Sequence, residues 1–356
     1  MSEKKIIKLD GSIGEGGGSI IRLSAGFSTL FNQPIHIYNI RANRQKPGLR
    51  QQHLLGLKTL AELTNSDLSQ CEVGSKEITL IPGGSIQMSE IDVNVNTAAS
   101  LGLLLQPILI ASLSMKKSQS LLVKLHGGGT FGKWAPSLNY LKDVTYNVFK
   151  KAGLNIVIKI NHHGFYPKGG ADVQCLISMD SHSLKPIKMT NLGNIASVNG
   201  EVILSNHFQY RNNIGERIKN TIIEEIKKYH QKVNIDIICR YVSSYSEGLG
   251  LHLWANSDTS AIISTGTILG ERRITSEQLG KLAVKELTKY IKNDIPVDSY
   301  LSDQLIPLMA YLKSSSSLKV LEITSHTQTN LDLIKKFSKR TYSIEKEDVG
   351  YCIEFD

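Results

Sequence analysis

The chain has 356 residues, 41% of them hydrophobic and 21% charged, which is an ordinary balance for a soluble globular protein. This length allows a full core and fits two domains, or one large domain with an insertion. The net charge of +9 favours an anionic partner, nucleic acid first, although lysines on solvated helix faces can account for much of it.

Two further patterns exclude whole classes of protein. The four cysteines lie far apart without a C-x-x-C pair, which fits neither a zinc cluster nor a disulfide-rich secreted scaffold. The N-terminus lacks the apolar core of a signal peptide, and the longest apolar run, 101–113, is too short to span a bilayer. We therefore expect a cytoplasmic protein that has no membrane partner.

The N-terminal stretch predicts a strand over 6–9, a glycine-dense turn over 14–18 and a helix over 19–31. Glycines let a ligand approach the main chain closely, and successive bare N–H groups can bind an anion. The turn holds one acid, Glu15, and a divalent cation shared with a phosphate would give it a role. The alternative is a hairpin turn whose glycines serve geometry alone.

Arg22, Arg41 and Arg44 follow this turn, and the guanidinium fork grips phosphate in bidentate fashion. On the alternative interpretation, these arginines are only surface charge. The stretch matches neither standard phosphate loop, because it lacks the lysine of G-x-x-x-x-G-K-[ST] and Ser19 interrupts G-x-G-x-x-G. By itself it indicates a phosphate site with a metal.

The next block repeats this order of elements without visible sequence identity. Its pattern predicts a helix over 97–113, a strand over 120–125, a second glycine turn over 127–130 and a helix over 137–152. For any one of these turns, the simple interpretation is a connection between a strand and a helix.

The composition changes near 181–186, and the strands and helix that follow indicate a smaller inserted domain. A capping-box pattern at 275–278 then starts another helix. Together these borders predict a large domain over 1–184 and 276–356, with the inserted domain over 185–275.

The C-terminal part places a histidine where open α/β layers tend to bind ligands. A helix is predicted from Tyr300 onward with Ser302 as its cap, and a strand is predicted over 318–323. His326 follows this strand and precedes a helix expected over 331–337. Hydroxylated neighbours and a helix N-terminus would provide donors for an anion, and a neutral imidazole is a competent nucleophile at phosphorus.

The other histidines carry less weight. His36 and His252 fall in strand patterns and are interpreted as packing residues, whereas His53 either contacts phosphate or caps its helix. No ligand spacing such as H-x-x-x-H occurs, which argues against a histidine-rich metal site.

Five motifs are spread over almost the whole chain. They are D-G-S-I-G-E-G-G-G-S-I-I-R at 10–22, I-R-A-N-R-Q-K-P-G-L-R-Q-Q-H at 40–53, G-F-Y-P-K-G-G at 164–170, Y-L-S-D-Q-L-I-P at 300–307 and H-T-Q-T-N at 326–330. In sequence and order, the motifs resemble the RNA 3'-terminal phosphate cyclase family. That family has true cyclases and a ribosome-assembly branch without the nucleophilic histidine, so a histidine at 326 favours the enzyme branch.

The resemblance implies an α/β (α+β) fold, with a large domain of three repeated β-α-β-α-β-β units and a smaller α/β domain inserted before the last unit. It also implies an ATP-dependent, nucleotidyl-transferring ligase. A histidine would take AMP from ATP, pass it to an RNA 3'-phosphate to give RNA(3')pp(5')A, and lose it when the 2'-hydroxyl closes a 2',3'-cyclic phosphate. The implied partners are ATP, magnesium or manganese, and RNA 3'-phosphate ends. The oligomeric state stays open, with a homodimer as one option.

The resemblance also implies a role for each matching residue. His326 is the nucleophile, and Glu15 binds the metal. The nucleotide contacts are Gln106, Pro136, Tyr300, Asp303 and Gln304. The phosphate and RNA-end contacts are Arg22, Arg41, Arg44, Gln52 and His53.

Three departures from the family pattern affect loops and spare the nucleophile. N-T-A-A-S at 96–100 replaces G-T-A-G-S, Asn139 stands where aspartate is usual, and Ala171 replaces a glycine. Two alternatives to a cyclase remain. One is a non-catalytic RNA-binding or ribosome-assembly protein of the same fold, and the other is an enolpyruvyl transferase, which shares the repeated unit but uses no histidine nucleophile.

Overall fold

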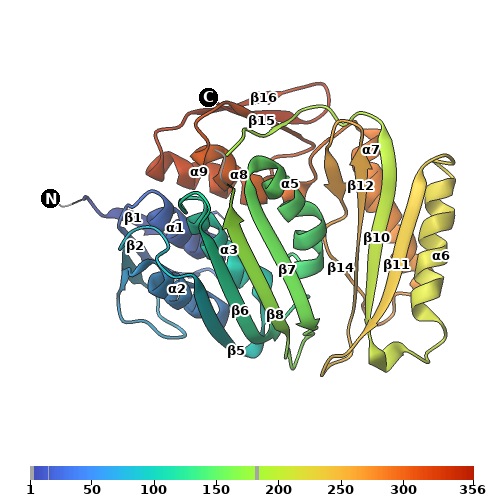
Figure 1. Cartoon of the computed structure of the whole chain (residues 1–356), viewed down its shortest axis with the longest axis horizontal. Coiled ribbons are helices and arrows are strands. Elements are labelled where there is room, and N and C mark those ends of the chain that lie inside the picture. Colours follow the sequence, from blue (N-terminus) through green and yellow to red (C-terminus); the bar gives the residue numbers. More distant parts are fainter. Residues whose placement is uncertain (1–3, 15, 181–183) are drawn as a thin grey trace.

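A computed structural model describes residues 4–14, 16–180 and 184–356. Within these residues, three units share one topology, in which a four-stranded sheet carries two helices (Figure 1). In each unit the sheet order is first, second, fourth and third strand, with the last two strands forming an antiparallel hairpin. The predicted β-α-β-α-β-β repeat is therefore confirmed.

The bounds of the elements follow the chain. The first unit holds β1 (Ile7–Asp10), α1 (Ser19–Leu30), β2 (Ile35–Tyr38), α2 (Gln51–Thr64), β3 (Asp67–Leu68) and β4 (Ile78–Ile81). The second holds β5 (Glu90–Ser100), α3 (Leu101–Ser112), β6 (Ser120–Gly129), the continuous helical segments α4 (Leu138–Tyr140), η1 (Leu141–Thr145, π-helical) and α5 (Tyr146–Ala152), then β7 (Leu154–His162) and β8 (Asp172–Met179). The third holds β9 (Lys188–Met189), α8 (Ser299–Tyr311), β15 (Ser316–Val320), α9 (Ser325–Phe337), β16 (Tyr342–Lys346) and β17 (Tyr351–Phe355).

A smaller α/β body is inserted between β9 and α8 and lies beside the second unit (Figure 1). It comprises β10 (Ile195–Ser205), η2 (Asn206–Phe208), α6 (Ile214–Lys227), β11 (Asn234–Val242), β12 (Leu249–Ser257), β13 (Ile262–Ser264), β14 (Ile268–Leu269) and α7 (Ser276–Lys292). Because β9 pairs with β15, the insertion interrupts the third unit after its first strand and does not precede that unit.

Among the described residues, the three units share one hydrophobic core and the insertion has another. The larger core joins side chains of all three units, whereas α6, α7 and the inserted sheet form another, which includes Ile222, Leu253 and Leu287. The capping box at Thr275 is present as predicted. The expected domain borders at residues 184 and 276 stay a prediction. They assign α7 to the large domain, whereas in the structure α7 packs in the core of the insertion. No described helix is both long and apolar enough to cross a bilayer.

Helix α1 lies at the centre of the large part, against α2, α3 and α9. All 12 of its residues are buried, which explains its nearly continuous apolar sequence. Gly26 permits close contact with α3, because a Cβ at that position would lie 2.8 Å from Ile110 Cβ. This packing fixes the direction of Arg22, which leaves the same helix toward the site described below.

Two predicted boundaries in the second unit were wrong. The helix expected over 97–113 begins only at Leu101, because β5 continues to Ser100 and pairs there with Gly129. The Ser100 hydroxyl then caps α3 by accepting a hydrogen bond from the Leu103 N–H at 3.3 Å. The three glycines of the turn expected over 127–130 form the end of β6.

Candidate active site

His326 lies in the first turn of α9 and is exposed. The helix expected over 331–337 therefore starts earlier, at Ser325, because the Thr324 hydroxyl caps it by accepting a hydrogen bond from the Thr327 N–H at 2.9 Å. The N–H groups at a helix N-terminus carry partial positive charge and stabilise an anion nearby. An imidazole in this position can meet a phosphate group.

Asp303 on α8 holds this turn in place. Its Oδ1 accepts hydrogen bonds from the hydroxyls of Thr324, at 2.9 Å, and Thr327, at 2.6 Å. The Asn330 amide donates to the carbonyl oxygens of His326, at 3.2 Å, and Asp303, at 3.3 Å. These contacts fix the backbone of His326 relative to α8.

Helix α8 is itself capped by Asp298, and the predicted cap, Ser302, lies inside the helix. The fully buried Asp298 carboxylate accepts hydrogen bonds from the N–H groups of Tyr300, at 3.0 Å, Leu301, at 2.9 Å, and Ser264, at 2.9 Å. Burial raises the pKa of Asp298 to about 7 despite these donors. Since Ser264 belongs to β13, this side chain ties the insertion to the helix that lines the site.

A cavity of about 430 Å³ brings together every residue predicted to contact the nucleotide. These are Gln106, Pro136, Tyr300, Asp303 and Gln304, and Arg22 and His326 line the same cavity. A proline ring and a half-exposed tyrosine ring provide apolar surfaces of the kind that a flat base requires. Gly266 has a φ of +65° and leaves no room for a side chain, because the ring of Tyr300 lies against it.

A second cavity, of about 810 Å³, gathers the residues predicted to contact phosphate and RNA ends. Its lining includes Arg22, Arg41, Arg44, Gln52 and His53, together with Arg50. The two cavities share Ser19, Arg22, Leu103, Lys133, Trp134 and His326. The histidine therefore lies where the predicted nucleotide cavity meets a strongly basic one.

Arg22 connects the two sets of residues. It is only 8% exposed, and its Nε donates a hydrogen bond to Gln106 Oε1 at 2.9 Å. A guanidinium held in this way is a preorganised positive charge, which suits the stabilisation of developing negative charge on phosphate.

His53 is buried and neutral. Burial, and after it the charges of Arg22, Arg41 and Arg50, lower its pKa to about 3. Its Nδ1 accepts a hydrogen bond from the Arg50 N–H at 3.2 Å, so the capping role left open by the sequence is present, and the ring also lines the basic cavity. Gly18 packs directly against this ring, and any side chain there would collide with it.

The predicted metal ligand, Glu15, lies outside the described residues, so its role stays a prediction. The glycines on either side, Gly14 and Gly16, have φ values of +65° and +56°, which a turn of this shape requires. A Cβ at Gly14 would lie 2.8 Å from the Thr329 hydroxyl oxygen, so the glycine turn lies against α9, the helix that carries His326.

Comparisons with known proteins show the family of this chain. The sequence profile described as RNA 3'-terminal phosphate cyclase matches residues 13–344. The chain belongs to the RNA 3'-terminal phosphate cyclase family. Proteins of that name from Pyrococcus abyssi and Pyrococcus furiosus are 34% identical to it, over 96% of this chain and 96% and 95% of theirs. The protein of that name from Methanothermobacter thermautotrophicus is 32% identical over 97% of this chain and 98% of its own.

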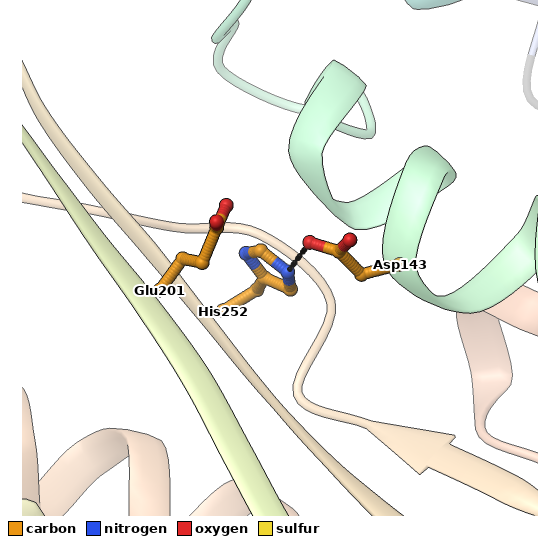
Figure 2. Close-up of side chains that lie close together, drawn as sticks. All are labelled: Asp143, Glu201 and His252. Carbon is orange, nitrogen blue, oxygen red and sulfur yellow. Dashed lines mark hydrogen bonds and ion pairs between the residues drawn. The ribbon is translucent and has the colours of Figure 1, made fainter. Parts of the chain in front are cut away.

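The structure also brings together three ionisable side chains that no spacing pattern in the sequence had indicated. Asp143 on η1, Glu201 on β10 and His252 on β12 come within 4.8 Å of one another at the junction of the second unit with the insertion (Figure 2). His252 Nε2 lies 3.1 Å from Asp143 Oδ2, and its other ring nitrogen faces Glu201 (Figure 2). The three residues lie on elements far apart in the sequence, so no local pattern could reveal the group.

The charges of this group are balanced within the chain. Glu201 accepts a hydrogen bond from Asn139 at 2.8 Å, Arg240 lies 3.3 Å away, and Lys142 bridges toward Asp143 and Glu201 at 3.3 and 3.7 Å. Two cations thus lie beside the two carboxylates, and the contacts of Glu201 with Asn139 and of His252 with Asp143 join the insertion to the second unit. An aspartate at position 139, which the family resemblance implies, would place a third carboxylate against Glu201.

Proposed function

We propose that this protein converts an RNA 3'-terminal phosphate to a 2',3'-cyclic phosphodiester with consumption of ATP, through an AMP bound to His326. The observation that carries the proposal is the position of His326, which lines both the nucleotide cavity and the basic cavity. The family membership and the names of the relatives support cyclisation of an RNA 3'-terminal phosphate.

The first step is nucleotidyl transfer to the histidine. A nitrogen of the neutral imidazole attacks the α-phosphorus of ATP, a P–N bond forms, and the bond to the bridging oxygen breaks to release pyrophosphate. Arg22 and the N-terminus of α9 offset the negative charge that develops on the phosphorus oxygens. Pro136 and Tyr300 hold the base, which leaves the α-phosphate beside His326.

The remaining steps occur toward the basic cavity. An oxygen of the RNA 3'-phosphate attacks the phosphorus of the histidine-bound AMP, the P–N bond breaks, and RNA(3')pp(5')A forms. The neighbouring 2'-hydroxyl then loses its proton and attacks the 3'-phosphorus, AMP leaves, and the cyclic phosphodiester closes. Arg41 and Arg44, beside Gln52, reduce the repulsion between the two phosphates during these steps. The expected magnesium or manganese at Glu15 belongs to this proposal, and no step above depends on it.

Product analysis tests the proposal. An oligoribonucleotide with a labelled 3'-phosphate is incubated with the protein, ATP and magnesium or manganese, and then treated with phosphatase. We expect the label to become phosphatase-resistant only when ATP is present, with one AMP released for each cyclised end. RNA binding without cyclisation under any of these conditions would favour the non-catalytic alternative.

A further inference from the structure

We propose that the indole of Trp134 is the stacking platform for the base of the RNA's 3'-terminal nucleotide. This inference rests on the proposed function and adds to it a residue that recognises the RNA end. Trp134 is 91% exposed, yet it lines both the nucleotide cavity and the basic cavity, as His326 does. A large aromatic side chain left in solvent beside a reactive histidine contributes little to the core, so its role lies in binding.

The local backbone holds the indole outward. Trp134 has a φ of +59°, a left-handed conformation that is unfavourable for a bulky residue. A tight turn fixes it, since the strand-like bridge between Gly132 and Ala135 closes around it and Lys133 Nζ pairs with Glu271 of the insertion at 3.3 Å. Strain of this kind persists where the surrounding structure enforces it, and it is common at ligand sites.

The chemistry of the two cavities favours the RNA base over the adenine of ATP. Pro136 and Tyr300 line the nucleotide cavity but not the basic cavity, and together they provide surfaces for one adenine. Trp134 extends into the second cavity, where Arg44 and Gln52 are expected to hold the terminal phosphate. A phosphate bound there brings its own ribose and base into the same cavity, within reach of the indole.

Stacking on an aromatic ring is the usual way to bind an unpaired base without choosing its identity. Lys133 Nζ lies 5.2 Å from the centre of the Trp134 ring. A cation beside the proposed platform would attract the sugar–phosphate backbone of the bound RNA. We therefore expect little preference among the four bases but a clear preference for an RNA end that has a base over one that lacks it.

Tryptophan fluorescence tests the contact without requiring any chemistry. The chain has two tryptophans, so Trp254→Phe leaves Trp134 as the single reporter. Titration with a 3'-phosphorylated oligoribonucleotide in the absence of ATP should quench the emission, and an oligonucleotide with an abasic 3'-terminal nucleotide should quench it much less. If Trp254→Phe does not fold, the difference between the unmodified protein and Trp134→Phe gives the same measurement. Unchanged emission while fluorescence anisotropy of a labelled RNA shows binding would overturn the proposal, and quenching by ATP alone would assign the indole to adenine.

Kinetics with Trp134→Ala provides the second arm. We expect the KM for RNA to rise roughly 5- to 150-fold, the range that corresponds to loss of one stacked base, while histidine adenylylation by ATP alone changes far less. Trp134→Phe should keep the KM for RNA close to that of the unmodified protein. With an RNA that has an abasic 3' end, the KM values of Trp134→Ala and Trp134→Phe should be the same. An equal loss with abasic RNA would show a structural role and contradict the proposal. If the unmodified protein forms no AMP adduct, the proposed function fails, whereas the fluorescence arm still decides whether Trp134 binds the base.

Discussion

The Oδ1 atom of Asp303 lies 2.6 Å from the hydroxyl oxygen of Thr327, the residue that follows His326. A carboxylate that lines the predicted nucleotide cavity thereby also fixes the first turn of the helix that carries His326. On the proposed function, binding of the nucleotide and orientation of the histidine therefore depend on the same side chain.

Asp303→Ala should therefore impair adenylylation and stability together. The substitution removes the acceptor of two hydroxyl donors, and we expect a loss of about 2 kcal/mol in the free energy of unfolding and a fall of at least tenfold in the rate of AMP transfer. Denaturant unfolding and single-turnover labelling measure the two effects. Thr327→Val, which removes one donor and leaves the carboxylate, should show a smaller loss of rate; equal rates for Asp303→Ala and the unmodified protein would contradict the role assigned to this carboxylate.

His53 should make the protein less stable in mild acid. Its pKa is about 3 in the folded protein and 6.5 in an ordinary setting, so between these values the unfolded chain takes up a proton that the folded protein does not. The contribution of the neutral ring is complete above pH 6.5 and is lost as the pH falls toward 3. Between pH 7 and 4.5 this one group should cost roughly 2–3 kcal/mol of stability.

The matched variants for this pH dependence are His53→Gln and His207→Gln, the second at an exposed position on η2. Unfolding by urea at several pH values should show a shallower decline for His53→Gln and an unchanged slope for His207→Gln. The same slope in both variants would mean that another group causes the acid sensitivity.

Asn139→Asp should destabilise the protein even though it introduces the residue that the family resemblance implies. The new carboxylate would face Glu201 Oε2, which now accepts a hydrogen bond from the Asn139 amide at 2.8 Å. We expect a loss of about 1–3 kcal/mol in the free energy of unfolding, because like charges meet at a mostly buried site. Adding Glu201→Gln should recover part of that loss, and a double-mutant cycle measures the coupling. Strictly additive effects would show that Asn139 and Glu201 do not interact, and would contradict this account of their contact.

Glu15→Ala should weaken metal-dependent adenylylation more than RNA binding, because Glu15 is predicted to bind a cation and to make no contact with RNA. The measurement compares AMP-adduct formation over a range of magnesium and manganese concentrations with RNA affinity from anisotropy. Equal loss of both would assign a structural role to the acid.

Most of the predicted site residues lie in motifs whose local conformation is fixed by glycines, caps or helix starts, and the structure places them around two adjoining cavities. Gln106 and Pro136 lie outside these motifs and were predicted from the family resemblance alone. Gln106 comes from the second unit and Tyr300 and His326 come from the third, and the structure brings all three to one cavity. The metal ligand Glu15 is untested, and the assignment of chemical roles to the other residues rests on the proposed function.

Other features could not be predicted, since they depend on contacts between distant segments. The two residues of β9 are too few to give a strand pattern, and only their pairing with β15 shows that the insertion divides the third unit. Asp298 was missed as a cap, and its hydrogen bond from the Ser264 N–H, in the insertion, could not be read from the local sequence. The group of Asp143, Glu201 and His252 arises from packing between units and leaves no spacing in the sequence.

Covalent labelling with α-labelled ATP tests the central claim most directly. The protein, His326→Ala and His207→Ala are incubated with the nucleotide and magnesium or manganese and separated under denaturing conditions. Because His326 is exposed, its removal should leave the circular dichroism spectrum unchanged. The account predicts an acid-labile, alkali-stable label on the protein and on His207→Ala, and none on His326→Ala. A label that survives in His326→Ala, or no label on the unmodified protein with either metal, would contradict it.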